Sequence, residues 1–586
     1  MQIYKAPIAD FRFILETFGY DRVQALPGNE DFDLDTVMML VEESGKFCAK
    51  EMLALNRSGD EEGVTYDPVE KTVTTPKGFD GLYRKYVESG MAGMTMPVEY
   101  GGGGAPRAVG IIMSELATAT NKSFSMCPGL NHGLVESLIH FGTDQQKKDW
   151  LPKLITGEWT GTMCLTEPHA GTDLGLLRTK AIPEGDHYRL TGTKIWITFG
   201  EHDLTDNIVH LVLARLPDAP PGIRGISVFL VPKYTLDGRR NEIYCGGLEH
   251  KMGIHASPTC VMNLENAEGY LVGEPHKGMK AMFVMMNYAR IAVGVEGIAL
   301  GEIAYQTAVA FSRDRRQGRS LNPERNDKSA AADNILVHPD VRRQLLNVRS
   351  TTEGMRALAL WCALEIDIAE GAEDEKDREI AGDLVAILTP IVKAFCTERG
   401  FQNVSDCMQV CGGSGYTTDW SIEQYLRDVR IALIYEGTNH IQALDLVGRK
   451  LPAGGGRMYR RFSKRLHKQV AAMRDHEAFD TFGAPLEQAI KRLDATTMEL
   501  ATRGMADQEE AAAVATNYLM LFGYTALAYV WCKLAGHAWG KSGSQNKTKV
   551  KMAEYYYKNV LPECEGLVAI MKAGKAQMMA FEDDEF

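Results

Sequence analysis

One carboxylate, Glu436, lies inside an otherwise apolar run and is followed at once by glycine. Residues 432–442 have the sequence Ala-Leu-Ile-Tyr-Glu-Gly-Thr-Asn-His-Ile-Gln. Apolar neighbours disfavour the ionised carboxylate, which suits a general base, and Gly437 would let a substrate approach the backbone. The alternative is a structural glutamate that caps the next helix, because Gly-Thr-Asn is also typical of a helix start. This segment alone leaves both interpretations open.

Length and composition limit the classes of protein. A chain of 586 residues is too long for one ordinary core, and 45% hydrophobic with 24% charged residues is typical of a globular protein. We see no apolar stretch of membrane-spanning length and no secretory signal at the N-terminus, so we expect a cytoplasmic protein without a membrane role. The net charge of -13 argues against a nucleic-acid binder.

The cysteines and one basic segment are the remaining compositional features. Eleven cysteines without paired spacing predict reduced core thiols. Cys407 and Cys411 lie four apart, but without a second pair or a histidine cluster they predict core packing rather than a metal site. Six basic residues recur between Arg457 and Lys468 on a helical pattern with an apolar stripe. A solvated basic face is the simplest interpretation, and a membrane-surface or nucleic-acid role is the alternative.

The spacing of apolar residues changes several times along the chain. Helical spacing of apolar residues begins at Leu34 and continues to about residue 154, whereas short β-branched or aromatic runs occur at 188–198, 208–213, 226–231 and 243–245. Helical patterns resume at Met279, a Pro-Ala-Gly-Gly-Gly segment interrupts them at 452–456, and Gly101–Gly104 predicts a flexible loop. We therefore predict an N-terminal extension and helical domain (1–158), a β domain (159–278), a helical bundle with Glu436 (279–451) and an additional helical domain (457–586).

Four segments resemble the acyl-CoA dehydrogenase family in order, spacing and residue type over about residues 35 to 450. They are Met-Cys-Leu-Thr-Glu-Pro-His-Ala-Gly-Thr-Asp (163–173), Lys-Ile-Trp-Ile-Thr (194–198), Gln-Val-Cys-Gly-Gly-Ser-Gly-Tyr (409–416) and Tyr-Leu-Arg-Asp-Val-Arg (425–430). The resemblance implies a mainly α fold with a central β domain: a helical N-terminal domain, a small β-barrel-like middle domain and a helical bundle. The extra C-terminal helical domain is similar to that of the family's long form.

The resemblance also implies a reaction, the α,β-dehydrogenation of an acyl-CoA thioester with FAD as cofactor. Side chains cannot accept a hydride, so a flavin is required. Glu436 would remove the α-proton, and its backbone N–H would help to hold the developing enolate oxygen. Some relatives carry the base just before an arginine on another helix. Ala289 precedes Arg290 here, and alanine cannot act as a base.

Several contacts are implied residue by residue. The residues implied to bind FAD are Met163, Leu165, Thr166, Trp196, Thr198, Arg315, Gln317, Gln409, Gly412, Gly413, Thr438 and His440. Thr172, Arg290 and Gly437 are implied to contact the substrate, although Arg290 could also form an ordinary surface ion pair. The far end of the acyl pocket is expected from residues 123–136 and 282–287.

Arg315 and Gln317 are implied to reach the FAD of a partner subunit, so we expect a homodimer. Glutamine stands before Gly318 where the family usually has phenylalanine. Within the family, the Met-Gln-Ile-Tyr-Lys-Ala-Pro opening and the Glu436 segment are most similar to bacterial enzymes acting on 3-methylmercaptopropionyl-CoA, with an electron-transfer flavoprotein as electron acceptor. The alternatives are a medium- or long-chain fatty acyl-CoA dehydrogenase, an acyl-CoA oxidase and a DNA-associated relative.

Overall fold

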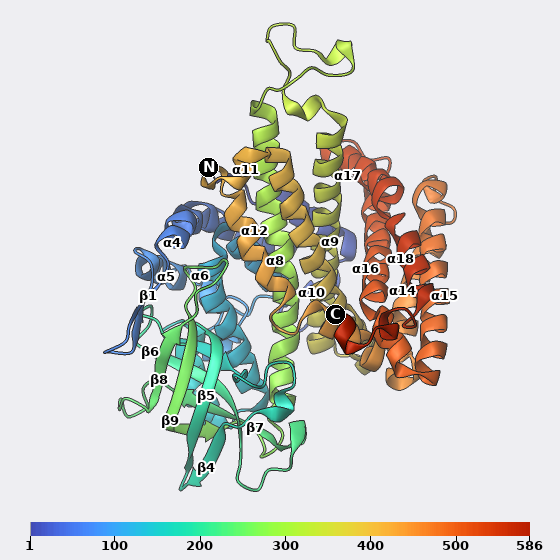
Figure 1. The fold of residues 1–586 in the computed structure, drawn as a ribbon. Coiled ribbons are helices and arrows are strands. Elements are labelled where there is room, and N and C mark those ends of the chain that lie inside the picture. The colour runs from blue at the N-terminus through green and yellow to red at the C-terminus, as the bar shows by residue number, and fades with distance from the viewer. Residues whose placement is uncertain (1) are drawn as a thin grey trace. The chain divides into compact units, whose positions relative to one another are not determined.

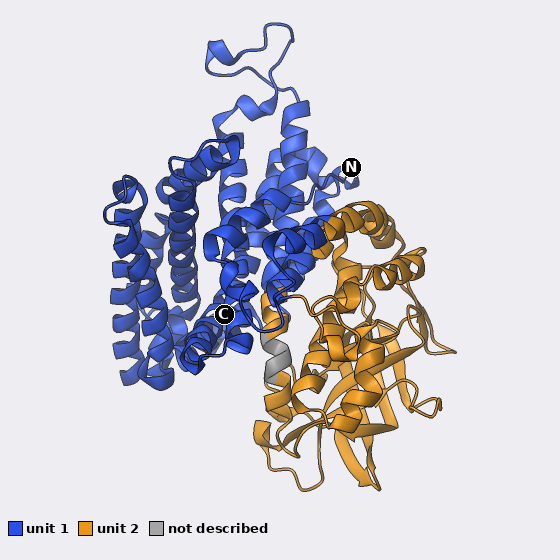
Figure 2. Ribbon diagram, turned by 180° about the vertical axis from the view of Figure 1, so that it is seen from behind, with its two compact units in different colours: residues 1–42, 106–115, 293–586 blue, residues 43–105, 116–292 orange. Residues whose placement is uncertain are grey.

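The computed structural model describes residues 2–586, apart from the side chains of residues 283–287. The chain forms two compact units (Figure 2): unit 1 consists of residues 1–42, 106–115 and 293–586, and unit 2 of residues 43–105 and 116–292. Two long helices, α6 (Arg107–Phe141) and α8 (Gly278–Asp314), contribute residues to both units.

Unit 2 contains a β-sheet that closes on itself (Figure 1). Its strands are β3 (Trp159–Cys164), β4 (Lys180–Glu184), β5 (His187–Thr198), β6 (Asn207–Arg215), β7 (Ile226–Pro232), β8 (Ile243–Leu248) and β9 (Thr259–Leu271). The order is β3-β6-β4-β5-β9-β7, with β8 beside β9, and β7 also pairs with β6, which closes a barrel. The four predicted strands are confirmed. Strands β3, β4 and β9 were not predicted.

Strand β6 shows how the barrel is packed on both faces. Leu211 and Leu213 belong to a core cluster that includes Leu134 of α6 and Trp150 of α7 (Asp144–Ile155). Val212 and Ala214 belong to a second cluster with residues of β5, β7 and β9. Side chains alternate between the two faces of a strand, so one strand that is buried on both faces serves both clusters.

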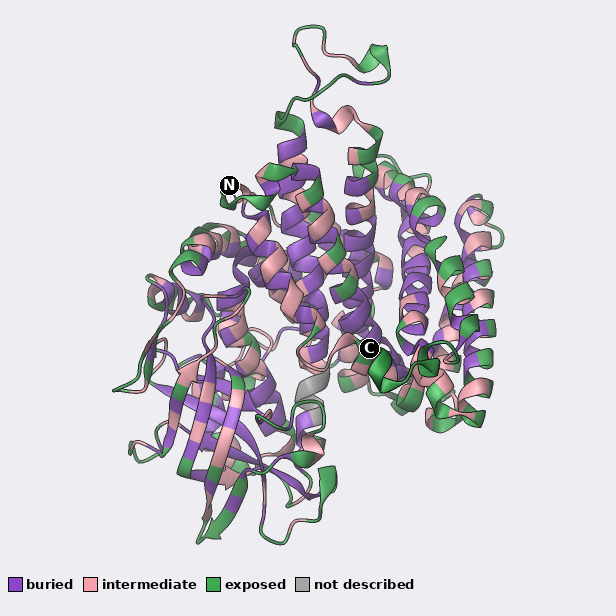
Figure 3. Ribbon diagram, viewed as in Figure 1, coloured by how far each residue is buried: buried purple, intermediate pink, exposed green. Residues whose placement is uncertain are grey.

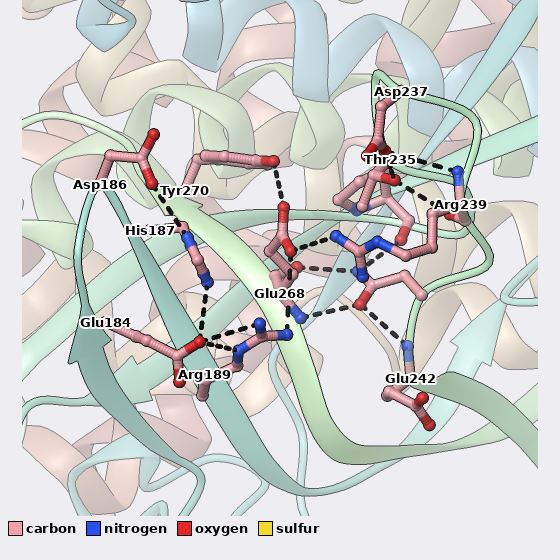
Figure 4. Close-up of polar contacts among 12 residues, drawn as sticks. Glu184, Asp186, His187, Arg189, Thr235, Asp237, Arg239, Glu242, Glu268 and Tyr270 are labelled. Carbon is pink, nitrogen blue, oxygen red and sulfur yellow. Dashed lines mark hydrogen bonds and ion pairs between the residues drawn. The ribbon is translucent and has the colours of Figure 1, made fainter.

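A polar network connects the β4–β5 hairpin to β9 (Figure 4). Glu268 of β9 accepts a hydrogen bond from the Tyr270 hydroxyl at 2.5 Å and one from the Arg239 guanidinium at 2.6 Å. Arg189 of β5 donates twice to Glu184 of β4, at 3.0 Å each. Arg189 also lies 3.8 Å from the Glu268 carboxylate. Glu268 therefore binds both the hairpin and the loop between β7 and β8.

Unit 1 is built from helices. They include α1 (Ile8–Phe18), α9 (Pro339–Gly371), α10 (Glu375–Cys411), α12 (Ile422–Arg430), α13 (Asn439–Asp445), α14 (Arg457–Met473), α15 (Ala484–Ala506), α16 (Gln508–Ala538), α17 (Ser544–Tyr555) and α18 (Glu563–Ala573). Burial is greatest along α9, α10 and α16 (Figure 3), where helices pack on several sides. The predicted break at 452–456 is confirmed, because Gly454, Gly455 and Gly456 all have positive φ before α14 begins.

Two of these helices correct the expectation about membrane-spanning length. Within the described residues, α10 and α16 are long and apolar enough to cross a membrane, and their most apolar windows are 78% and 67% buried inside the protein. Core helices reach the same length and hydropathy when they are covered on all sides. These two helices are therefore only weak support for a membrane role.

Helix α14 carries the basic segment and is amphipathic as predicted. Arg457 and Arg461 pair with Asp383 of α10 at 2.8 and 2.5 Å, and Arg465 pairs with Glu365 of α9 at 3.0 Å. Half of the basic residues therefore bind neighbouring helices instead of forming a solvated face, while Arg460, Lys464 and Lys468 are exposed. The DNA-associated alternative loses much of its support.

The cysteine prediction is confirmed, because all eleven cysteines are free and buried. Cys407 and Cys411 lie on α10, and burial raises the pKa of both thiols. Among the residues that the structure describes, no group of three His, Cys, Asp or Glu side chains could hold a metal ion.

A buried arginine connects four helices of unit 1. Arg356 of α9 donates hydrogen bonds at 2.7 Å to Asp10 of α1, Glu115 of α6 and Glu302 of α8. Burial raises the pKa of the Glu115 carboxyl to about 7, although Arg356 opposes the rise. Arg356 therefore compensates the buried carboxylates of Glu115 and Glu302 and shares the half-buried Asp10 with Lys549.

Candidate active site

Glu436 has an unusual backbone conformation. Its φ is +57°, in the left-handed region, and Gly437 follows with a φ of +82°. For a residue with a Cβ atom this region costs roughly 1–2 kcal/mol. Non-glycine residues in such conformations concentrate at functional sites, where the surrounding structure maintains them.

Gln442 of α13 holds the carbonyl side of this loop. Its buried Nε2 donates to the carbonyl oxygens of Glu436 and Gly437 at 3.1 and 3.2 Å. A Cβ atom at Gly437 would lie 2.8 Å from that nitrogen, so both the left-handed φ and the packing require glycine here. Sequence reasoning missed Gln442, although it is the last residue of the segment that drew attention to Glu436.

The predicted helix start is confirmed, but Glu436 does not form the cap. The Thr438 hydroxyl accepts the backbone N–H of Ile441 at 3.3 Å and is the N-cap of α13. The structural interpretation of Glu436 as a capping residue was therefore wrong.

Tyr435 is held from α8. Its hydroxyl lies 2.5 and 2.6 Å from the two carboxylate oxygens of Glu296 and donates to them. Burial, reinforced by the Glu296 carboxylate, keeps the pKa of Tyr435 well above its usual value. The tyrosine is therefore a neutral donor on the N-terminal side of Glu436.

In unit 2, the segment after β3 is fixed by a buried ion pair. Lys194 of β5 donates to the Leu165 carbonyl at 3.1 Å and to Glu167 at 2.8 Å, and Ile195 donates its N–H to the Thr166 carbonyl at 2.9 Å. Burial disfavours the Glu167 carboxylate, but Lys194 and hydrogen bonds lower its pKa to about 2. Two of the quoted motifs are thus joined by an ion pair that the sequence reasoning did not identify.

Trp196 lies at an irregularity in β5. The pairing with β9 shifts between Lys194 and Ile197, and Trp196 has a φ of +61° and is 59% exposed. Thr198 is half-buried at the end of the same strand, and Met163 of β3 is buried. An indole presented to solvent at a β-bulge offers a flat apolar surface that an aromatic ring could cover. These residues fit a flavin.

The segment that contains Thr172 borders a cavity of about 500 Å³ in unit 2. The side chains that line the cavity include those of His169, Leu176 and Arg178. Thr172 is exposed and is not part of this lining. Arg215 also lines it, but that guanidinium is bound to carbonyl groups, including Gly175 at 2.6 Å and Gly222 at 2.9 Å. The cavity therefore combines apolar walls with cationic or polar side chains.

Arg290 is 5% exposed on α8, so the alternative of an ordinary surface ion pair was wrong. Two residues earlier on the same helix, the ring of Tyr288 stacks on the His132 ring of α6, with ring centroids 4.0 Å apart. Residues 123–136, expected at the end of the acyl pocket, lie on α6. The side chains at 283–287, expected beside them, lie outside the described part of the chain.

Arg315 and the glycine turn come together in unit 1. Arg315 follows α8, and its Nη2 is 3.4 Å from the hydroxyl of Ser414 in α11 (Gly413–Tyr416), the short helix after α10. Gly412 and Gly413 are exposed, and a Cβ atom at either would meet nothing within 4 Å. One exposed surface therefore presents a guanidinium beside open backbone. Gln409, which is also exposed, lies in the last turn of α10.

Gln317 and His440 have different surroundings. The Gln317 backbone N–H donates to the Asp333 carbonyl, and the Gln317 carbonyl lies at hydrogen-bond distance from the His338 ring. These contacts hold the base of the loop after α8. The Gln317 side chain is exposed. The His440 ring lies 3.2 Å from the Thr516 hydroxyl of α16. That contact with the additional helical region was not expected, and a cofactor contact at His440 stays a prediction.

Comparison with known proteins identifies the family. Models of the acyl-CoA dehydrogenase N-terminal, middle and C-terminal domains match residues 35–158, 162–267 and 276–451, and the model "Acetyl-CoA dehydrogenase C-terminal like" matches residues 462–582. The 3-methylmercaptopropionyl-CoA dehydrogenase of Ruegeria pomeroyi is 41% identical over an alignment 585 residues long, which covers 96% of each chain. This chain belongs to the acyl-CoA dehydrogenase family. The predicted fold class and enzyme class are confirmed.

Other relatives of this acyl-CoA dehydrogenase are a second enzyme matched over nearly its whole length and two solved structures. A broad-specificity linear acyl-CoA dehydrogenase of Mycobacterium tuberculosis is 32% identical over 96% of each chain. A Bacillus anthracis acyl-CoA dehydrogenase, solved in complex with FAD, is 23% identical over 94% of this chain and 90% of its own, with a TM-score of 0.74. A chain from work on the electron transferring flavoprotein of Acidaminococcus fermentans is 26% identical, with a TM-score of 0.59. The match covers 71% of this chain and 98% of that chain.

Proposed function

We propose that this acyl-CoA dehydrogenase oxidises 3-methylmercaptopropionyl-CoA to its 2-enoyl product. The observation that carries the substrate assignment is the 41% identity to the Ruegeria pomeroyi enzyme over nearly the whole of both chains. Acyl-CoA dehydrogenation itself is the activity of the family, and FAD is the family's cofactor. A medium- or long-chain fatty acyl-CoA is the second candidate, favoured by the Mycobacterium tuberculosis relative.

Glu436 is proposed to remove the α-proton. The carboxylate takes the proton as the Cα–H bond breaks, and the electron pair moves toward the thioester carbonyl. The Glu436 N–H would donate to that oxygen as charge develops, which is worth a few kcal/mol for a well-oriented donor. FAD, when bound, accepts the hydride from the β-carbon. Loss of both hydrogens leaves the α,β double bond.

The FAD contacts are proposed from two surfaces. Met163, Leu165, Thr166, Trp196 and Thr198 would hold the flavin ring, because Trp196 offers an exposed aromatic face beside half-buried hydroxyls. On unit 1, Arg315 would bind the pyrophosphate of a partner subunit's FAD, since a guanidinium pairs with phosphate in a bidentate geometry. The glycine turn beside it would cover the adenosine part.

The cavity near Thr172 is proposed to take the anionic end of CoA. Arg178 is exposed at this cavity of about 500 Å³, and His169 adds a second polar group. Phosphates prefer such a combination of a guanidinium and neighbouring donors. Arg178→Ala should raise the KM for acyl-CoA with little change in kcat, because this contact lies away from the reacting carbons. An unchanged KM would place CoA elsewhere.

The proposed electron acceptor is an electron-transfer flavoprotein, and the proposed location is the cytoplasm. The Acidaminococcus fermentans likeness supports the acceptor. An oxidase would instead pass electrons to oxygen. Hydrogen peroxide at the full catalytic rate in air would favour the oxidase, whereas slow turnover in air and fast turnover with a flavoprotein acceptor would favour the dehydrogenase.

The deciding experiment is a series of kcat/KM values from butanoyl-CoA to palmitoyl-CoA, alongside 3-methylmercaptopropionyl-CoA. One methylene changes discrimination by only about 1–3 kcal/mol, so overlap with short acyl-CoAs is expected. A maximum at the long-chain end, with negligible activity on the thioether, would refute the substrate assignment. An anaerobic titration that fails to bleach bound flavin with any acyl-CoA would refute the reaction.

A further inference from the structure

Glu296 is a lone charge in an apolar stretch of α8. Residues 291–300 have the sequence Ile-Ala-Val-Gly-Val-Glu-Gly-Ile-Ala-Leu, and every neighbour of Glu296 in this stretch is apolar or glycine. Val295 and Ile298 are buried, and Glu296 itself is half-buried. A carboxylate in such surroundings is unfavourable unless a donor compensates it.

The Tyr435 hydroxyl is such a donor. It lies 2.5 and 2.6 Å from the two Glu296 oxygens, a short distance that is typical of a hydrogen bond to a charged acceptor. Tyr435 comes from a loop 139 residues further along the chain. The bond therefore ties α8 to the residue that immediately precedes the proposed base.

The loop needs contacts of this kind. Glu436 and Gly437 both have positive φ, between the short helical turn Ile431–Leu433 and α13. Gln442 holds the two carbonyl groups on the C-terminal side. A right-handed conformation at Glu436 would be sterically easier and would turn its side chain and N–H in new directions. The Tyr435 side chain restrains the loop from the N-terminal side.

We propose that Glu296 and Tyr435 are positioning residues for α-proton removal. Together with Gln442 they keep Glu436 in its left-handed conformation, which fixes the direction of both its carboxylate and its N–H. This inference rests on the proposed role of Glu436 as the base. Neither residue exchanges a proton with the substrate.

The kinetic test compares Tyr435→Phe, Glu296→Leu, Glu296→Gln and the double variant Tyr435→Phe/Glu296→Leu in the full-length, FAD-loaded protein. We expect each of the first two to lower kcat roughly ten- to a hundredfold, because small displacements of a catalytic group have effects of that size. KM for acyl-CoA and the FAD content should stay unchanged. Glu296→Gln should recover part of kcat, since its amide oxygen still accepts the hydroxyl.

Coupling and isotope effects separate positioning from a general structural defect. The double variant should lose no more than the more damaged single variant, because both changes remove one interaction. With acyl-CoA deuterated at the α-carbon, the isotope effect on kcat should increase in the variants as proton removal becomes slower. Tyr556→Phe is the matched control: it removes another buried hydroxyl bond in unit 1, from Tyr556 to the Tyr524 carbonyl at 2.7 Å, and should leave kcat unchanged.

A crystal structure of Tyr435→Phe gives a measurement independent of activity. Glu436 should leave the left-handed region or occupy two conformations in this variant. A retained φ near +57° with normal kcat would overturn the inference, as would losses that multiply in the double variant or that parallel a loss of FAD. If the wild-type protein oxidises no acyl-CoA, the proposed function fails, while the conformation of Glu436 in the variant still decides whether the pair positions it.

Discussion

Replacing Glu115 with glutamine is expected to stabilise unit 1 at pH 8 and to leave its stability unchanged near pH 4. Arg356 binds Glu115 together with Asp10 and Glu302, and Lys549 binds Asp10 and Glu353 at the other side of the same cluster. With Arg349, which pairs with Glu353, three cations face four carboxylates. One negative charge is in excess, and the cluster becomes neutral when Glu115 binds a proton.

The magnitude follows from the pKa of Glu115. Burial raises it from 4.5 to about 7 against the opposing effect of Arg356. A carboxyl with a raised pKa contributes its full stability below the unfolded value of about 4.5, and this contribution is lost as the pH rises through 7. One unit of pKa corresponds to about 1.4 kcal/mol, so the loss is about 3 kcal/mol. Glutamine keeps an oxygen for Arg356 and cannot ionise, so the variant avoids the loss.

Thermal unfolding of the wild-type and variant proteins between pH 4 and pH 8 tests this reasoning. The midpoints should coincide at pH 4 and diverge above pH 5, with the Glu115→Gln protein the more stable by a few degrees at pH 8. Asp10→Asn is the matched control. Although burial opposes ionisation of Asp10, Lys549 and Arg356 lower its pKa, so its removal should destabilise the protein at pH 8. A Glu115→Gln protein that is less stable than wild type at pH 8 would refute the charge argument.

Three further outcomes concern the proposed site. Glu436→Gln should retain FAD, measured by flavin absorbance, while turnover falls by a factor of about a hundred or more because the base is lost; near-normal turnover would contradict its role. Gly437→Ala should lower the unfolding midpoint and kcat, because the φ of Gly437 is +82° and the new Cβ would lie 2.8 Å from Gln442 Nε2. Gly448→Ala, whose new Cβ would meet no atom within 4 Å, should change neither quantity. Arg315→Ala should release FAD from a protein that light scattering still shows as a dimer; an active, FAD-bound monomer in the wild type would refute the shared site.

Periodicity identified most of the architecture, and its failures have physical reasons. The strands around residues 188–198 and 226–231 were predictable because β-branched and aromatic residues occur between clear turn residues. Strand β3 was missed because Trp-Thr-Gly-Thr-Met-Cys is buried throughout and shows no alternation. The Arg457–Lys468 helix was predicted as amphipathic, but which of its charges bind other helices depends on Asp383, Glu379 and Glu365, and no local pattern contains that information.

The structural role of glycine residues was the hardest to predict from the sequence. Gly101–Gly104 was predicted to be a flexible loop, and the structure contradicts this. The N–H groups of Gly102, Gly103 and Gly104 bond to the carbonyl groups of Pro97, Gly93 and Met96, and a Cβ atom at Gly102 would lie 2.2 Å from the Met96 oxygen. Close backbone approach and flexibility both favour glycine, so composition cannot separate them.

The conformation of Glu436 lies beyond local pattern analysis for a related reason. Left-handed backbone at a glutamate depends on contacts that outweigh its intrinsic cost, and one of them, Glu296, is distant in sequence. A signal was nevertheless present. Residues 291–300 and 432–442 each contain a single carboxylate among apolar neighbours, and a carboxylate in such a place requires a donor. Tyr435 is the donor to Glu296 and is also the neighbour of Glu436 in the sequence. The isolated carboxylate of Glu296 was therefore a sign of the contact that supports the loop of Glu436.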